Sequence, residues 1–130
     1  MAGLDTNKKA SAQRQTERAI TLFRNGDLDC AVTLAAAAEG MLPDTEDPHI
    51  FQVLKPHFKQ LQVNVIVEWL KHKTADSPEN VTITEFEATM VVARSITKFV
   101  AVYHQSCKLF EEFLWWAHEA GHLPRPRRGH

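Results

Sequence analysis

Residues 118–122 read His-Glu-Ala-Gly-His, the sharpest grouping of chemically reactive side chains in this sequence. Two histidines four residues apart can share one face of a helix, where their ring nitrogens can bind a zinc ion. The carboxylate of Glu119, between them, would activate a zinc-bound water. His118, Glu119 and His122 are therefore the candidate metal site.

These five letters resemble the zincin metalloprotease motif, but the surrounding sequence departs from it. A catalytic zinc needs a third protein ligand, and the metzincin extension of the motif adds a glycine and a histidine further on. Arg125 and Arg128 stand at those two positions. We therefore predict no metal and no cofactor, with His118 and His122 compensating the dipole at a helix C-terminus.

Glu39 is a second candidate, because it lies between Ala35 and Leu42 on the apolar stripe of its segment. A carboxylate in that place needs a partner, and Lys71 or His72 near the end of another apolar segment could supply it. We expect a structural ion pair rather than a ligand site. The possible polar site consists of Glu39, Asn64, Glu68, Lys71 and His72.

The third candidate is the run Phe113-Leu114-Trp115-Trp116. On a helix, four consecutive side chains point in directions that span about 300°, more than one packed face can cover. Either this helix is central in the fold or part of the run meets another subunit, and the sequence leaves both readings open. We predict a homodimer whose interface includes Phe113, Trp115 and Trp116.

The elements that must position these residues are helical. Apolar residues recur at helical spacing over residues 11–25 and end at Gly26, since glycine is favoured just past a helix end. Asp27 is a good N-cap for the next helix, residues 28–42. A third helix is expected over residues 48–73, with a kink or break at Pro56.

A capping box of Thr84 and Glu87 opens the longest periodic segment, residues 84–118. This segment is either one helix or two, divided near Gln105 and Ser106. The pattern as a whole predicts an all-α fold, a single-domain bundle of about five helices in an up-down arrangement. The bundle should span residues 11–122, between a flexible N-terminus, residues 1–10, and a basic tail, residues 123–130.

Composition places this chain of 130 residues among globular proteins, with 44% hydrophobic and 24% charged residues and few glycines and prolines. No uncharged run approaches the roughly 18 residues that span a bilayer, so we expect no membrane association. Cys30 and Cys107 have no paired spacing, which indicates reduced core residues and a cytoplasmic protein. The basic ends flank an acidic body, but they are short, so binding of nucleic acid is not expected.

Three stretches carry a resemblance to known proteins: residues 31–40, Asn64 with the segment 69–72, and residues 110–116. They resemble a set of small all-helical bacterial proteins that is similar in turn to HEPN-like helical bundles. The resemblance implies the bundle and, for some members, a ribonuclease toxin or a nucleotide-binding partner. HEPN nucleases use an arginine and a histidine four to six residues apart on a late helix. In this chain Arg94 has no histidine before His104, which is too far away. Arg125 and His130 have a matching spacing, but they lie in the tail.

The sequence therefore leads us to expect a non-catalytic interaction or regulatory protein. The alternatives are a HEPN-like ribonuclease or toxin-system component, whose partner would be a nucleotide or RNA, and a zinc hydrolase that uses residues 118–122.

Overall fold

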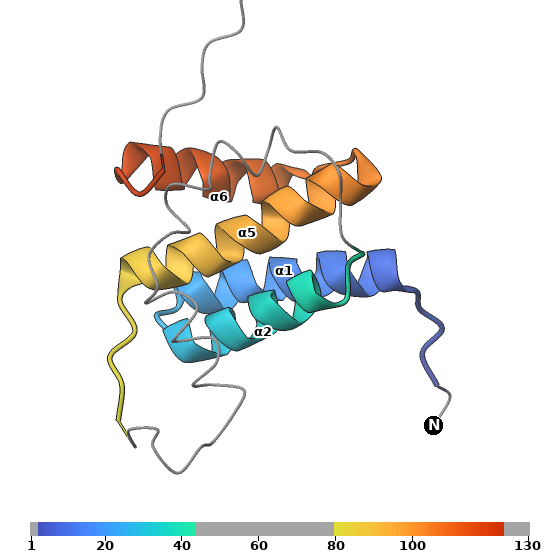
Figure 1. Cartoon of the computed structure of the whole chain (residues 1–130), viewed down its shortest axis with the longest axis horizontal. Helices are drawn as coiled ribbons and strands as arrows, with labels where there is room; N and C mark the ends of the chain where they lie inside the picture. The colour runs from blue at the N-terminus through green and yellow to red at the C-terminus, as the bar shows by residue number, and fades with distance from the viewer. Residues whose placement is uncertain (1–2, 44–79, 124–130) are drawn as a thin grey trace, which may run out of the picture.

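The computed structural model describes residues 3–43 and 80–123, which contain four α-helices and no strand (Figure 1). The all-α fold class is confirmed. The helix predicted over residues 48–73, its kink at Pro56, and the basic tail from residue 124 onward lie outside the described residues. The up-down bundle of about five helices therefore stays a prediction.

Helix α1, Lys8–Arg24, begins three residues before the predicted start at Ser11. The side chain of Asn7 provides the N-cap, because its Oδ1 accepts a hydrogen bond from the backbone N–H of Ala10 at 2.8 Å. Residues 8–10, which the sequence analysis assigned to a flexible N-terminus, are thus helical. Sequence reasoning missed this start because the polar first turn has no apolar pattern.

The turn after α1 has the predicted form. Gly26 has a φ of 85°, the left-handed conformation that only glycine adopts without strain. It brings the N–H of Asp27 to the carbonyl of Leu22 at 2.9 Å, which satisfies the end of α1. Helix α2, Leu28–Gly40, then runs back antiparallel to α1 (Figure 1).

Small side chains hold α1 and α2 together. Alanine at the contact lets two helix backbones approach closely, and the alanines at this seam are fully buried. Ala35 and Leu42, the two members of the apolar stripe that flank Glu39, are both buried. The fully buried alanines of the pair are Ala12, Ala19, Ala31, Ala35 and Ala38.

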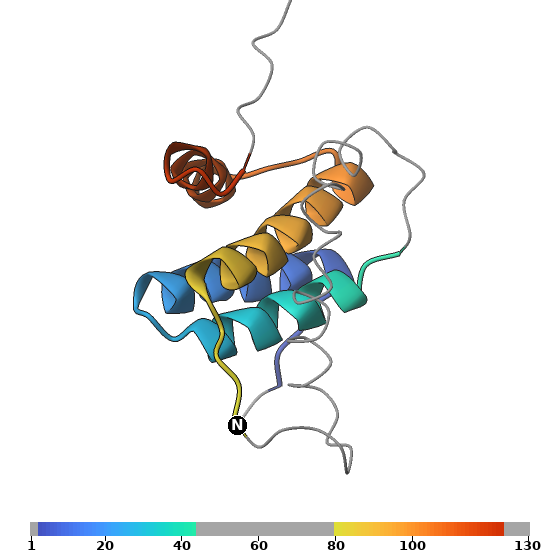
Figure 2. The ribbon, with the colours of Figure 1, turned by 60° about the vertical axis from the view of Figure 1, so that its left-hand side comes forward.

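Helix α5, Glu85–Tyr103, lies across this hairpin, antiparallel to α1 and parallel to α2 (Figures 1 and 2). Its capping box is confirmed: the N–H of Glu87 donates to Thr84 Oγ1 at 3.1 Å, and the N–H of Thr84 donates to the Glu87 carboxylate at 3.3 Å. Every residue from Ala88 to Thr97 except Arg94 is buried. This helix is therefore the centre of the described fold.

The chain breaks after α5, as the sequence allowed. His104 takes a left-handed φ of 53°, and four non-helical residues, 104–107, separate α5 from α6, Lys108–Glu119. Its N-cap residue is Cys107, whose side chain makes no capping hydrogen bond. Helix α6 runs antiparallel to α5 (Figure 1).

A second left-handed glycine, Gly121 with a φ of 82°, ends α6 and turns the chain back. The N–H of His122 donates to the carbonyl of Ala117 at 2.9 Å, and Leu123 is buried in the core. Leu123 therefore belongs to the packed fold rather than to the tail that the sequence analysis started there. No helix in the described part of the chain is long and apolar enough to cross a membrane.

Candidate functional site

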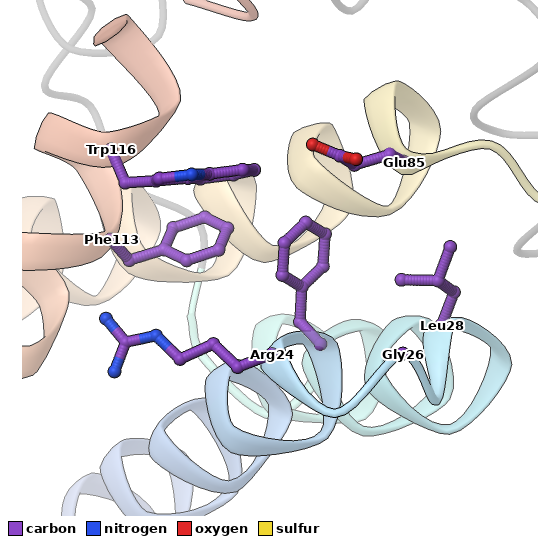
Figure 3. A pocket seen from close by; sticks show the side chains of 7 residues that line it. Arg24, Gly26, Leu28, Glu85, Phe113 and Trp116 are labelled. Atoms are coloured by element: carbon purple, nitrogen blue, oxygen red, sulfur yellow. The ribbon is translucent and has the colours of Figure 1, made fainter. Parts of the chain in front are cut away.

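A pocket of about 440 Å³ opens at the end of the fold where the α1–α2 turn, the first turn of α5 and the second half of α6 meet (Figure 3). Its volume is within the range of about 300–1,000 Å³ typical of ligand sites. Three stretches distant in sequence contribute to it: residues 23–28, the start of α5 and residues 113–116. The lining residues are Phe23, Arg24, Gly26, Leu28, Glu85, Phe113 and Trp116.

Aromatic rings form the back wall of this pocket. The ring of Phe23 lies edge-on to Phe113 and to Trp116, with both centroid distances 5.3 Å. Edge-to-face contacts of this kind add to the stability that burial alone provides. Phe113 is 1% exposed, so the wall is anchored in the core and is rigid.

Opposite charges stand at the rim. Arg24 and Glu85 extend on opposite sides of the pocket (Figure 3). Glu85 accepts a contact from His122, with 3.2 Å between Oε1 and Nε2, whereas the guanidinium of Arg24 is 4.0 Å from the carboxylate of Glu112. An exposed pair at that separation contributes little, so Arg24 is available to a ligand.

The two histidines of the candidate metal site do not act together. Helix α6 ends at Glu119, and Gly121 reverses the chain before His122, so the two rings do not share a helix face. The Nδ1 of His118 is 3.4 Å from the carbonyl of Leu123, while His122 packs its ring against Trp116 and contacts Glu85. Glu119 is exposed. Among the described residues there is no group of three or more side chains that could hold a metal ion.

Glu39 lies far from this pocket, at the other end of α2. Its Oε1 accepts a hydrogen bond from Arg94 Nη2 at 3.0 Å, and its backbone carbonyl accepts one from Lys98 Nζ at 3.1 Å. The partner of the carboxylate is thus an arginine of α5, which sequence reasoning did not consider. The predicted partners, Lys71 and His72, together with Asn64 and Glu68, lie outside the described residues.

The aromatic run on α6 separates into inward and outward side chains. Phe113 is buried and packs on Phe23, so it borders the exterior only at the pocket, and its place at a subunit interface stays a prediction. Trp116 is half-buried at the pocket wall. Trp115 is 61% exposed and is available for contact with another molecule.

Arg94 and His104, the arginine and the histidine compared with the HEPN pattern, lie far apart. Arg94 is in the middle of α5 and His104 follows its end; ten residues of helix separate them by about 15 Å. Cys30 is exposed on α2, which corrects its prediction as a core residue. The negative charge of Asp29 raises the pKa of the Cys30 thiol, so this cysteine stays protonated and is a poor nucleophile at neutral pH.

Of the pocket residues, sequence reasoning identified only Phe113 and Trp116 as candidates. Phe23 and Leu28, three residues before and two after Gly26, were the available signal, because the predicted turn at Gly26 keeps both at the same end of the fold. No family model, no curated protein and no solved structure matches this chain. The function is therefore argued from the pocket alone.

Proposed function

We propose that this chain is a non-catalytic interaction or regulatory protein, and that its pocket receives an apolar side chain of a protein partner. The single observation that supports this proposal is the pocket of about 440 Å³ with a rigid wall of Phe23, Phe113 and Trp116. Pockets of this kind take the aromatic or aliphatic anchor that carries most of the binding energy in a protein interface.

The polar groups of the pocket favour binding over a reaction. Of its lining residues, only Arg24 and Glu85 carry ionisable side chains, and no lining residue offers a hydroxyl or thiol nucleophile. Glu85 is paired with His122 and occupies the first turn of α5, where the helix dipole stabilises its charge. A charge on each side of an apolar floor orients a bound group without reacting with it.

The proposal also covers the oligomeric state and the location of the protein. We infer a homodimer as the assembled form and the cytoplasm as its location, because the cysteines show no disulfide spacing and α6 presents Trp115 outward. A bundle completed by a fifth helix from residues 48–73 is part of the same proposal.

Indole is a suitable probe of the pocket, since it reproduces the largest apolar side chain. Titration of indole into the ¹⁵N-labelled Trp115→Ala variant, which lacks the exposed indole of the chain, should shift the backbone amides of Gly26 and Leu28 and the indole N–H of Trp116. We expect a Kd on the order of 1 mM, typical of so small a ligand. Leu28→Trp should fill the pocket and abolish binding, whereas Leu34→Trp, on the same helix but outside the pocket, should not.

The catalytic alternative has a separate readout. Purified protein incubated with single-stranded RNA should leave the RNA intact. Cleavage by the wild type would overturn the non-catalytic proposal, and the absence of any indole-induced shift near Gly26 would overturn the role given to the pocket.

A further inference from the structure

The inward packing of its neighbours on α6 keeps Trp115 exposed. Its neighbours Phe113 and Trp116 both face inward, so a rotation of α6 that buried Trp115 would expose Phe113. In the described part of the chain only one other large apolar side chain is exposed, that of Leu4 before α1. An outward-facing indole on a helix is suited to be the anchor side chain of an interface, and such an anchor binds in a pocket of the partner.

The charges around Trp115 argue against simple contact between two copies of α6. Glu111, Glu112 and Glu119 lie one helical turn from Trp115, at spacings of four, three and four residues, and all three are exposed. Two such faces placed against each other would bring like charges together, which destabilises the contact. Lys108, 3.8 Å from Glu112, offsets only part of this negative charge, so a cation on the opposing surface would stabilise contact with the Trp115 face.

The pocket described above provides an apolar floor and a cation together. Arg24 stands at its rim and holds Glu112 of its own chain only loosely, at 4.0 Å. When an indole enters the pocket, the glutamates beside it come close to this guanidinium. The aromatic wall of Phe23, Phe113 and Trp116 offers the ring edges and faces that an indole prefers.

We propose that the occupant of the pocket is Trp115 of a second copy of this chain, so that two copies exchange tryptophans in a two-fold dimer. This inference rests on the proposed function and names its partner. The donor and the acceptor share helix α6, since Trp115 is followed directly by the pocket residue Trp116. A two-fold axis between the two features lets each copy give one indole and accept the other.

Sedimentation equilibrium at micromolar to high micromolar concentration tests this dimer. The wild type should dimerise with a Kd on the order of 10–100 µM, in the weak class expected of a small interface. Trp115→Ala should raise the Kd by about 30-fold or more, since it removes the anchor from both contacts. The matched control is Leu4→Ala, which removes the other exposed apolar side chain and should leave the Kd unchanged.

Mixing two defective variants distinguishes the exchange from any other interface. Trp115→Ala keeps the pocket but lacks the anchor, and Leu28→Trp keeps the anchor but blocks the pocket. Each alone should be monomeric, while an equimolar mixture restores one of the two contacts and should form heterodimers. If the mixture stays monomeric while the wild type dimerises, the exchange is wrong.

A measurement on the wild type alone covers the case in which Leu28→Trp does not fold. Tryptophan fluorescence should shift to the blue as concentration rises through the Kd, and Trp115→Ala should lose that shift. A wild type that remains monomeric, or a Trp115→Ala variant that dimerises normally, would overturn the inference. Indole binding to monomeric Trp115→Ala would then still uphold the proposed function, so the two failures are distinguishable.

Discussion

Glutamine in place of Glu39 tests whether the carboxylate of α2 is a structural group. The Oε1 of Glu39 accepts from Arg94 Nη2 at 3.0 Å, and the two side chains are 17% and 20% exposed. A hydrogen bond between charged groups contributes about 1.5–3 kcal/mol, against about 0.5–1.5 kcal/mol for a neutral one. Glutamine keeps the acceptor but loses the charge, so Glu39→Gln should lower the free energy of unfolding by about 1–1.5 kcal/mol.

Urea denaturation followed by circular dichroism measures that loss. A thermal melt should show a fall in Tm of roughly 3–7 °C for a domain of this size. The matched control is Glu112→Gln, which makes the same chemical change at the half-exposed contact with Arg24, 4.0 Å long. Because exposed pairs contribute little, the control should lose no more than about 0.5 kcal/mol.

A double-mutant cycle then isolates the pair. Arg94→Met alone leaves the carboxylate of Glu39 mostly buried without its cation, so the double variant Glu39→Gln with Arg94→Met should lose less than the two single losses added. A coupling energy below about 0.3 kcal/mol, or a Glu39→Gln loss equal to that of Glu112→Gln, would refute the structural role.

Four other outcomes follow from the same structure. Thr16 and Ser95 share a fully buried hydrogen bond of 2.7 Å, so Thr16→Val should lower the free energy of unfolding by about 1–2 kcal/mol in a urea titration, and adding Ser95→Ala should recover part of it. Gly26→Ala should lose about 1 kcal/mol because of its φ of 85°, whereas Gly40→Ala, at a helical position with open space, should be neutral or stabilising in the same assay. Elemental analysis of the purified protein should find no stoichiometric zinc; about one zinc per chain that His122→Ala removes would revive the metal site. Filter binding should show RNA affinity that is weak and lost by about 200 mM salt, and tight binding above that concentration would favour the nuclease alternative.

Local signals in the sequence predicted the described helices well. The capping box at Thr84 and the left-handed Gly26 both stand where the sequence placed them, because each depends only on residues within one turn. Trp115 is exposed, which agrees with the prediction that one packed face cannot cover four consecutive apolar side chains of a helix. Helical periodicity fixes such assignments without knowledge of the neighbouring helices.

The partners across the fold could not be found in this way. Arg94, 55 residues from Glu39, lies within a run of buried α5 residues, and no local rule tells which of several cations a buried carboxylate meets. The pocket is likewise a product of assembly, since its wall joins Phe23 of α1 to Trp116 of α6. Cys30 was mispredicted as a core residue because it stands in an apolar run of α2. The apolar residues extend around more of this helix than its neighbours cover, so Cys30 is left exposed.

The alanine seam between α1 and α2 also bears on the order in which the chain folds. The hairpin closes through a loop of three residues, so its contacts form between near neighbours and require little loss of chain entropy. The contacts of α5 are remote: Thr16 and Ser95 are 79 residues apart, and Glu39 and Arg94 are 55 apart. Since folding proceeds fastest through local contacts, we expect the hairpin to form first and α5 to dock onto it in a later, slower step.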